Sequence, residues 1–418
     1  MTPLPEAGIP AASAGETTLG DHVLGQLLRL GATVGLSGAD TAVYGQALLD
    51  SLGDAARRPL SLPPASSSFL SDDHTPVEFS LACTADGAPA LRVLVEPGWA
   101  HGDMGDSGRA GLDAIRAMAA RWNFSTDRLD SLADLFLPAE AEGPLSLWYA
   151  LDLRAGGVPG VKVYLNPSAA GPEHAERTVR EALRRLGYGG AFAHLPPAAG
   201  YPFLALDLGD WTSPRVKVYV KHSGMSADDA CALSSDSGAA AADVRYFFHA
   251  AAGALQPSGQ EGDGTLRLLR RSGLTCHSFT GGDSAPSGFT LHIPVRDYAR
   301  DDEEALARAT ALLTRFGMDP SVLRDSLSAL TRRQLTDGVG LIAYLALVYE
   351  RNRQPRITAY LSSEAYLTRP PQEQYAQAGH VPAQRTRNAL NPERKAAGPA
   401  GPHTAQKEVT WSRTASKL

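Results

Sequence analysis

The sequence predicts an α+β protein in which a closed ten-stranded antiparallel β-barrel is ringed by α-helices. Three observations support this fold: paired segments of alternating apolar and polar residues, helical segments between the pairs, and nearly even spacing of the pairs. A long antiparallel sheet tends to close on itself, because closure removes its exposed edges. We therefore expect five repeats of the form helix, strand, strand, helix.

The five predicted strand pairs occupy most of the chain. Corresponding positions in the second strands of successive pairs are about 55 to 75 residues apart. The pairs are expected near residues 77–96, 145–166, 202–221, 266–295 and 341–362.

The helical segments between these pairs have recognisable starts and ends. Residues 173–190 begin with an acidic residue, repeat apolar residues at helical spacing and end in glycine. Residues 301–317 have an acidic first turn, which favours the helix dipole, and Gly317 suits the position after the last turn. Residues 110–122 and 125–136 predict a further pair of helices.

The two ends of the chain differ in composition from the repeats. Residues 1–17 are rich in proline, alanine and glycine, which predicts a loose N-terminal arm. Residues 369–418 contain few large apolar side chains and several prolines and glycines, which predicts a disordered tail. The sequence therefore predicts a single barrel domain over residues 18–368.

The overall composition narrows the classes of protein. The 418 residues are 43% hydrophobic, as in a globular protein, and a net charge of −6 gives no general reason to expect nucleic acid or an anionic membrane as a partner. Three widely separated cysteines fit neither a disulfide framework nor a zinc site, and the first ten residues do not resemble a secretory signal. We therefore expect a reduced, cytoplasmic protein with no membrane partner. The abundance of alanine, glycine, arginine and proline suggests a GC-rich bacterial genome.

Cations and tyrosines share one face of several predicted strands. Side chains two positions apart lie on the same face of a strand, and the opposite face of VKVYL and RVKVYVKH is apolar. If the apolar face meets the surrounding helices, the polar face lines an open lumen. On this polar face we place Glu78, Arg92, Lys162, Tyr164, Arg215, Lys217, Tyr219, Thr290, His292 and Tyr360.

The charges in this lumen predict an anionic ligand. Unpaired cations in an enclosed space are costly, and the same faces offer only Glu78, Glu96, Asp152 and Asp207 as counter-charges. The surplus of cations suits a diphosphate. Phenol rings attract a cation through their faces, so tyrosines beside the anion site suit the ionisation of an allylic diphosphate. Glu78 can accept a hydrogen bond from a ring N–H or take up a proton.

Five segments, taken in order, resemble those of a known enzyme family. TPVEFSL, LRVLVEP, VKVYLNP, RVKVYVKH and ITAYLSS are similar to motifs of the indole prenyltransferases of the dimethylallyltryptophan synthase type, over roughly residues 20–365. The resemblance implies the barrel of αββα repeats. It also implies transfer of a dimethylallyl group from dimethylallyl diphosphate to a ring carbon of L-tryptophan or a simple derivative. The family's ionisation step is independent of metal, so no cofactor and no Mg²⁺ is expected.

The resemblance also implies roles for individual residues. Glu78 matches the residue that holds the indole N–H. The diphosphate-binding positions are Arg92, Lys162, Arg215, Lys217 and Arg351. The positions that shield the carbocation are Tyr164, Tyr219 and Tyr360, with His292 where many relatives have tyrosine. Two further positions are expected near the aromatic substrate: Thr290, where some relatives have glutamine, and Trp148 or Tyr149, about where some fungal relatives have lysine.

Two other functions stay open from the sequence. The same chemistry can act on another acceptor, such as tyrosine, a cyclic dipeptide or a polyphenol, and the barrel can instead bind an anionic metabolite without catalysis. Metal-bridged prenyl chemistry is not expected, because the acidic run at residues 301–305 is typical of a helix start rather than of a metal site. The predicted partners are dimethylallyl diphosphate and an aromatic acceptor; the oligomeric state and the alkylated ring position are not predicted.

Overall fold

The structure is a computed structural model that describes residues 15–138, 140–209, 214–253, 266–282, 284–351 and 353–373. Most of the predicted arm and most of the predicted tail therefore lie outside the described residues. The boundaries of the predicted domain stay a prediction.

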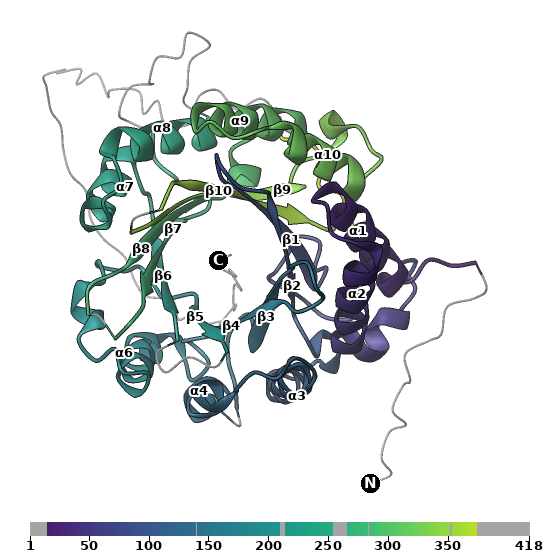
Figure 1. Cartoon of the computed structure of the whole chain (residues 1–418), viewed down its shortest axis with the longest axis horizontal. Coiled ribbons are helices and arrows are strands. Elements are labelled where there is room, and N and C mark those ends of the chain that lie inside the picture. Colours follow the sequence, from purple (N-terminus) through teal and green to yellow (C-terminus); the bar gives the residue numbers. More distant parts are fainter. Residues whose placement is uncertain are drawn as a thin grey trace, which may run out of the picture.

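Ten strands form a closed antiparallel barrel (Figure 1). Each strand pairs with its neighbours in sequence, and the first strand pairs with the last, so the predicted closed barrel is confirmed. The strands are β1 (Val77–Cys83), β2 (Ala90–Val95), β3 (Leu147–Asp152), β4 (Gly160–Leu165), β5 (Leu204–Leu208), β6 (Val216–His222), β7 (Gly273–Phe279), β8 (Gly288–Ile293), β9 (Ile342–Glu350) and β10 (Arg356–Ser362).

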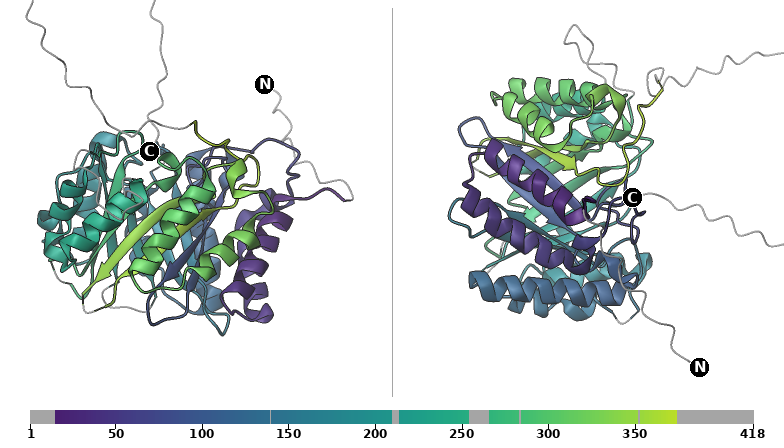
Figure 2. Two further views of the ribbon diagram at one scale, coloured as in Figure 1. Left: turned by 90° about the horizontal axis from the view of Figure 1, so that it is seen from above. Right: turned by 90° about the vertical axis from the view of Figure 1, so that its right-hand side faces the viewer.

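Helices surround the barrel and run alongside the strands (Figures 1 and 2). They are α1 (Leu19–Thr33), α2 (Gly38–Leu52), α3 (Met104–Trp122), α4 (Asp127–Asp130), α5 (Ala133–Phe136), α6 (Ala175–Arg185), α7 (Ala227–Leu233), α8 (Ala241–Ala252), α9 (Asp302–Arg315) and α10 (Ser321–Leu330). None of these helices is long and apolar enough to cross a lipid bilayer.

The main hydrophobic core lies between the outer face of the barrel and the helices. Val161 and Val163 of β4 belong to the same buried cluster as Val179 and Leu183 of α6. The outward side chains of the strands are therefore the apolar ones, as the alternation in the sequence predicts. The inward side chains are left to form a polar lumen.

The helix predicted over residues 125–136 is broken into α4 and α5. The break falls at Ser131, whose carbonyl accepts a hydrogen bond from Nη1 of Arg185 on α6 (2.9 Å). The hydroxyl of Ser131 also turns back to the carbonyl of Arg128 (2.8 Å). These two hydrogen bonds compete with the regular hydrogen bonds of a helix. The spacing of apolar residues in this segment does not indicate either of them.

The acidic run at residues 301–305 begins a helix, as predicted. The side chain of Asp301 accepts a hydrogen bond from the backbone N–H of Glu304 and caps α9. Asp302 forms an ion pair with Arg333 and accepts a hydrogen bond from the N–H of Gly340. Both acids therefore have structural partners.

Candidate active site

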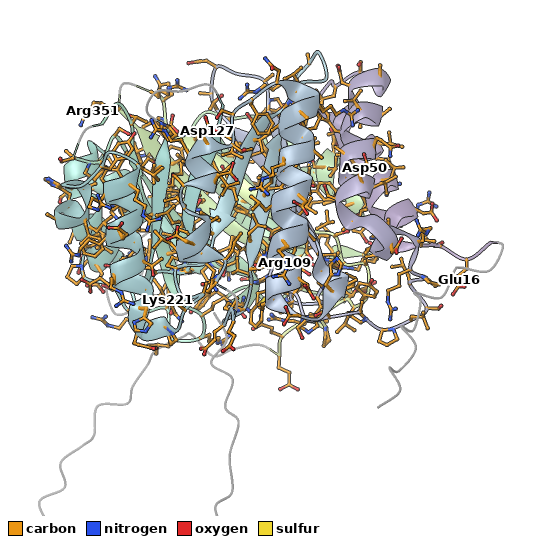
Figure 3. All side chains as sticks on the ribbon, turned by 90° about the horizontal axis from the view of Figure 1, so that it is seen from below. Glu16, Asp50, Arg109, Asp127, Lys221 and Arg351 are labelled. Carbon is orange, nitrogen blue, oxygen red and sulfur yellow. The ribbon has the colours of Figure 1, made fainter. Side chains whose placement is uncertain are left out.

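The inward side chains of β6 show how the lumen is organised along its axis. Arg215, Lys217, Tyr219 and Lys221 follow one another at two-residue intervals, so neighbouring members are roughly 6–7 Å apart along the strand. Along the strand, two cations, Arg215 and Lys217, come first and Tyr219 follows. Lys221 lies at the far end of the barrel. Lys221 and Arg351 mark opposite ends of the strands (Figure 3). We describe the lumen as a charged layer, an aromatic layer and a mouth.

The charged layer contains five cations and three carboxylates from seven strands or their ends. It consists of Arg92, Lys162, Arg215, Lys217, Arg356, Asp152, Asp207 and Glu350. Four of the five sequence-predicted diphosphate residues therefore lie together. Cross-strand register explains the grouping, because Arg92 pairs with Asp152 and Lys162 pairs with Asp207 on adjacent strands.

Ion pairs tie most of these charges together. Nε of Arg92 lies 2.9 Å from Oδ1 of Asp152, and Nζ of Lys162 lies 3.2 Å from Oδ1 of Asp207. Arg215 reaches Oδ2 of Asp207 at 2.7 Å and Oε1 of Glu350 at 3.1 Å. These distances place two basic side chains on Asp207 alone.

The two acids shared by several cations have lowered pKa values. Burial opposes the ionisation of Asp207, but Lys162 and Arg215 outweigh it and hold the pKa below its usual value. Burial also opposes the ionisation of Glu350, and Arg356 and Arg215 lower its pKa in the same way. Both carboxylates are therefore charged at neutral pH, and the layer keeps a surplus of positive charge.

Lys217 differs from the other cations of the layer. Its side chain is buried, and among the described residues no carboxylate lies within ion-pair distance of it. Burial first, and then repulsion from Lys162, lowers the pKa of Lys217 to about 7. A bound anion would reverse this effect, because it would supply the missing opposite charge.

The aromatic layer is a nearly continuous band of rings. Ring centroids are 6.0 Å apart for Tyr164 and Tyr219, 5.6 Å for Tyr219 and His292, and 5.7 Å for His292 and Tyr360. Tyr344 extends the band at 6.4 Å from Tyr360. The four sequence-predicted shield residues therefore lie side by side, with Tyr344 as a fifth member.

His292 completes this band as a neutral ring. Burial first, and then the charge of Lys217, lowers the pKa of His292 to about 3. Its Nε2 lies 3.2 Å from the hydroxyl oxygen of Tyr360. The imidazole therefore adds no positive charge to the band at neutral pH, and it offers a carbocation a π face in the same way as the tyrosines.

A cavity of about 240 Å³ opens at the mouth, on the far side of the aromatic layer from the charged layer. Trp148 and Phe203 form part of its wall, with ring centroids 5.1 Å apart. Trp148 thus faces inward, whereas Tyr149 points outward into the core and is fully buried. The cavity has the flat apolar walls that suit an aromatic ligand.

Glu78 lies in the wall of this cavity, close to the aromatic layer. Its neighbour in the β1–β10 register is Ser362, two residues beyond Tyr360. Burial raises the pKa of Glu78 to about 8, and the nearby Arg296 only partly offsets this effect. The carboxyl group therefore carries its proton at neutral pH in the free protein and is in position to meet a ring N–H.

A second buried carboxyl group, that of Glu96, lies behind the cavity wall. Glu96 accepts a hydrogen bond from the hydroxyl of Ser68, a cavity residue. Burial raises the pKa of Glu96 to about 7, and its hydrogen bond with Ser68 moderates the effect. Glu96 is thus only partly ionised near neutral pH. Among the described residues it forms no ion pair with Arg92, Lys162 or Arg215, although the sequence placed it among their counter-charges.

Two sequence-predicted residues belong neither to the charged layer nor to the cavity wall. Thr290 points inward from β8 and is buried beside Cys276 and Val348, nearer to the charged layer than to the cavity. Arg351 is exposed in the turn after β9 and does not join the charged layer. It was placed there by counting back from Tyr360, but the strand ends before that position is reached.

Sequence reasoning missed Arg356 and Glu350 in the charged layer. Arg356 precedes Tyr360 by four residues in the same strand, so alternation alone places it on the inward face. Glu350 likewise continues the inward series that starts at Tyr344. The alternation in both strands is therefore enough to predict these two inward positions. The motif resemblance pointed to Arg351 instead of Arg356.

Comparisons with known proteins agree on one family. The family model described as tryptophan dimethylallyltransferase matches residues 41–324. A solved complex of the prenyltransferase PriB with L-tryptophan and dimethylallyl thiolodiphosphate is 57% identical, covers 85% of this chain and 99% of that chain, and has a TM-score of 0.81. The 5-dimethylallyltryptophan synthase from Streptomyces coelicolor is 58% identical, with coverage of 85% and 100% and a TM-score of 0.80. The 6-dimethylallyltryptophan synthase from Micromonospora olivasterospora, solved with DMASPP and Trp, is 36% identical, with coverage of 85% and 99% and a TM-score of 0.76.

Proposed function

Because the chain belongs to the tryptophan dimethylallyltransferase family, we propose that it transfers a dimethylallyl group from dimethylallyl diphosphate to an indole ring carbon of L-tryptophan. The protein is a prenyltransferase. The observation that carries the proposal is the order of the three layers along the lumen. A diphosphate, an allyl cation and an indole must line up in that same order for the reaction to occur.

The charged layer holds the diphosphate in this proposal. Arg92, Lys162, Arg215 and Lys217 bind its oxygens, and Arg356 takes the place first expected for Arg351. When the bond between the allylic carbon and the diphosphate oxygen breaks, its electron pair stays with the leaving group, and these cations stabilise the developing negative charge. Since lysine and arginine supply that charge, we propose that ionisation needs no metal ion.

The aromatic layer shields the allyl cation. Tyr164, Tyr219, His292 and Tyr360 offer π faces to the cation and exclude water from it. The indole carbon that faces the cation then attacks it and forms the new carbon–carbon bond. Glu78 accepts the hydrogen bond of the indole N–H, which increases the nucleophilicity of the ring. The ionised carboxylate of Glu78 then takes up the proton lost from the alkylated carbon, which restores aromaticity.

None of the three cysteines, all within the described residues, is part of a disulfide, which suits a reduced setting. We retain a cytoplasmic location as part of the proposal. The cavity wall formed by Trp148 and Phe203 suits a flat ring. It does not by itself distinguish L-tryptophan from tyrosine, a cyclic dipeptide or a polyphenol, so experiment decides among these acceptors.

Incubation with dimethylallyl diphosphate and a panel of acceptors tests the proposal. The panel contains L-tryptophan, L-tyrosine, a tryptophan-containing cyclic dipeptide and a polyphenol, each with and without EDTA. We expect a monoprenylated product from L-tryptophan, seen by mass spectrometry and located by proton NMR, at a rate that EDTA does not change. Release of diphosphate without any prenylated acceptor would contradict the transferase assignment, and a strict need for Mg²⁺ would contradict the role given to the cations.

A further inference from the structure

A second cavity lies at the end of the barrel opposite the mouth, and we call it the distal cavity. It has a volume of about 280 Å³ and is lined in part by the turn between β1 and β2 and the turn between β9 and β10. These turns contribute Thr84, Asp86, Gly87, Arg353 and Gln354. Arg351 marks this end of the strands, and Lys221 marks the mouth (Figure 3). The proposed reaction assigns no role to the distal cavity.

The distal cavity borders the charged layer. Glu350 and Arg356, which belong to that layer, also line the cavity. Oε1 of Glu350 lies 3.1 Å from Nη1 of Arg215, and its Oε2 lies 3.6 Å from Nε of Arg353. The side chain of Arg353 is 75% exposed, whereas that of Glu350 is only 18% exposed. One carboxylate therefore connects an arginine of the lumen with an arginine at the protein surface.

Positive charge is in surplus along this connection. Arg356 is a third neighbour of Glu350, with its Nη2 3.9 Å from Oε1, so three guanidinium groups share one carboxylate. The other acid of the cavity wall, Asp86, is exposed, and solvent screens its charge. Nε of Arg356 is buried and, within the described part of the chain, has no hydrogen-bond partner. A buried donor without a partner costs free energy, and an anion beside it would supply the missing acceptor.

The order of the three layers makes the mouth a poor exit for the diphosphate product. After the transfer, the prenylated acceptor lies in the aromatic layer and the acceptor cavity, between the diphosphate and the mouth. Aromatic rings such as those of Tyr219 and Tyr360 present faces of negative potential, which repel an anion. A diphosphate that moved past them would lose its hydration and gain no opposite charge.

We propose that the distal cavity is a second diphosphate site, in which Arg356 and Arg353 receive the leaving diphosphate from the charged layer and release it while the prenylated acceptor still fills the mouth. This inference rests on the proposed function. Positive side chains along a cleft raise the local concentration of an anion and direct its movement. Arg353 holds the anion only weakly, because solvent screens its exposed charge. In the free protein the mouth is open as well, so the distal route matters when an acceptor or product occupies the acceptor cavity.

Release of radiolabelled diphosphate with the mouth open and with the mouth filled separates the two routes. The protein is loaded with labelled diphosphate, and an excess of unlabelled diphosphate then starts the exchange, with or without saturating L-tryptophan. Because no allylic donor is present, L-tryptophan fills the acceptor cavity without reacting. Rapid filtration gives the release rate. For the wild type we expect L-tryptophan to slow release by less than about threefold, since the distal route stays open.

Two variants obstruct the distal route. Gln354→Trp fills the cavity with a large ring, and Arg353→Glu reverses the charge at its surface end. With L-tryptophan bound, each should slow release about tenfold, whereas without L-tryptophan each should release diphosphate at nearly the wild-type rate through the open mouth. Ala88→Trp is the matched control, because Ala88 is exposed in the turn between β1 and β2 but does not line the cavity. Retained binding of dimethylallyl thiolodiphosphate shows that a variant is folded, and Thr84→Trp replaces Gln354→Trp if the latter is not.

Two failures are distinguishable. If the wild type transfers no dimethylallyl group to L-tryptophan, the proposed function itself is wrong. If the wild type prenylates L-tryptophan but L-tryptophan slows diphosphate release by more than about threefold, the mouth is the exit and the inference is overturned. Wild-type release rates in the folded Gln354 and Arg353 variants with L-tryptophan bound would overturn it as well, because the distal cavity would then not lie on the route.

Discussion

The charged layer and the mouth both contain buried charge, but they are built differently. Strands and strand ends supply the charged layer, so cross-strand register fixes its ion pairs, such as Arg92 with Asp152. At the mouth, Glu78 and Lys221 come from strands, whereas Asp72 and Arg271, which also line the cavity, come from loops and Arg296 from the short 3-10 helix Val295–Asp297. Strand pairing thus determines the positions of the charged-layer side chains. The positions of the side chains at the mouth depend on how the loops pack.

Each region also contains a titratable group that, within the described residues, has no side chain of opposite charge at ion-pair distance. Burial lowers the pKa of Lys217 to about 7 and raises the pKa of Glu78 to about 8. Both side chains therefore tend towards their neutral forms in the free protein. We infer that the substrates stabilise the charged forms of these two side chains. A bound diphosphate keeps Lys217 protonated, and an indole N–H stabilises the ionised form of Glu78.

The largest expected effect comes from Lys217→Met. Loss of this cation should lower kcat/KM for dimethylallyl diphosphate by about 10³-fold, because it removes a donor aimed at developing charge. KM for L-tryptophan should change little. Lys221→Met on the same strand is the control, since Lys221 lies at the mouth (Figure 3). Equal losses in the two variants would show that the cations act on the diphosphate only through the general field of the lumen.

The same substitution should stabilise the fold. The pKa of Lys217 is about 7 in the folded protein, against 10.5 as its ordinary value. The unfolded chain therefore binds the proton more tightly, and the resulting penalty is full below pH 7 and fades as the pH rises from 7 towards 10.5. Lys217→Met removes the penalty and should raise the free energy of unfolding at pH 7 by about 1–3 kcal/mol. Denaturant unfolding measures this gain, and a loss of stability would contradict the unpaired state of Lys217.

The next effect is that of Glu78→Gln at the mouth. Glutamine has the shape of the protonated acid but cannot become a carboxylate, so kcat for L-tryptophan should fall roughly a hundredfold. The dissociation constant of dimethylallyl thiolodiphosphate should stay at the wild-type value, since that ligand lies in the charged layer. Full turnover by this variant would show that Glu78 has no role in catalysis.

The sequence predicted the charged and aromatic layers far better than the mouth. Alternation along a strand places Lys217 and Tyr219 on one face without any knowledge of the rest of the chain. Asp72 and Arg271 are about 200 residues apart and lie in loops, where no periodicity indicates direction, so their contact follows only from closure of the barrel. Arg351 was misplaced for a related reason: spacing from a motif is reliable within a strand and fails across a turn.

A smaller effect is proton uptake in the charged layer. At pH 8, Lys217 is mostly neutral in the free protein, because its pKa is about 7. Binding of dimethylallyl thiolodiphosphate should raise that pKa, so the complex takes up nearly one proton at pH 8 and almost none at pH 5.5. Calorimetry in buffers of different ionisation enthalpy measures the uptake, and Lys217→Met should abolish it. Equal uptake in the variant would assign the proton to another group.

The pH profile of the acceptor half gives a comparable test at the mouth. If Glu78 acts as a carboxylate, kcat/KM for L-tryptophan should rise with pH up to an apparent pKa of about 8, at saturating dimethylallyl diphosphate. The rise should be absent in Glu78→Gln. A rise that persists in the variant would point to Glu96, whose buried carboxyl has a pKa of about 7.

The smallest expected effect lies between the two regions, at His292. His292→Phe keeps a ring in the aromatic layer but removes the contact between Nε2 and the Tyr360 hydroxyl, so turnover should fall no more than about threefold, as for one modest hydrogen bond. His292→Ala instead opens a gap between Tyr219 and Tyr360. Water that enters this gap should capture the allyl cation, and the ratio of dimethylallyl alcohol to prenylated tryptophan should rise several-fold. Chromatography of both products gives the ratio directly. If alanine and phenylalanine leave the same ratio, the imidazole ring does not shield the cation, and the aromatic layer consists of its tyrosines alone.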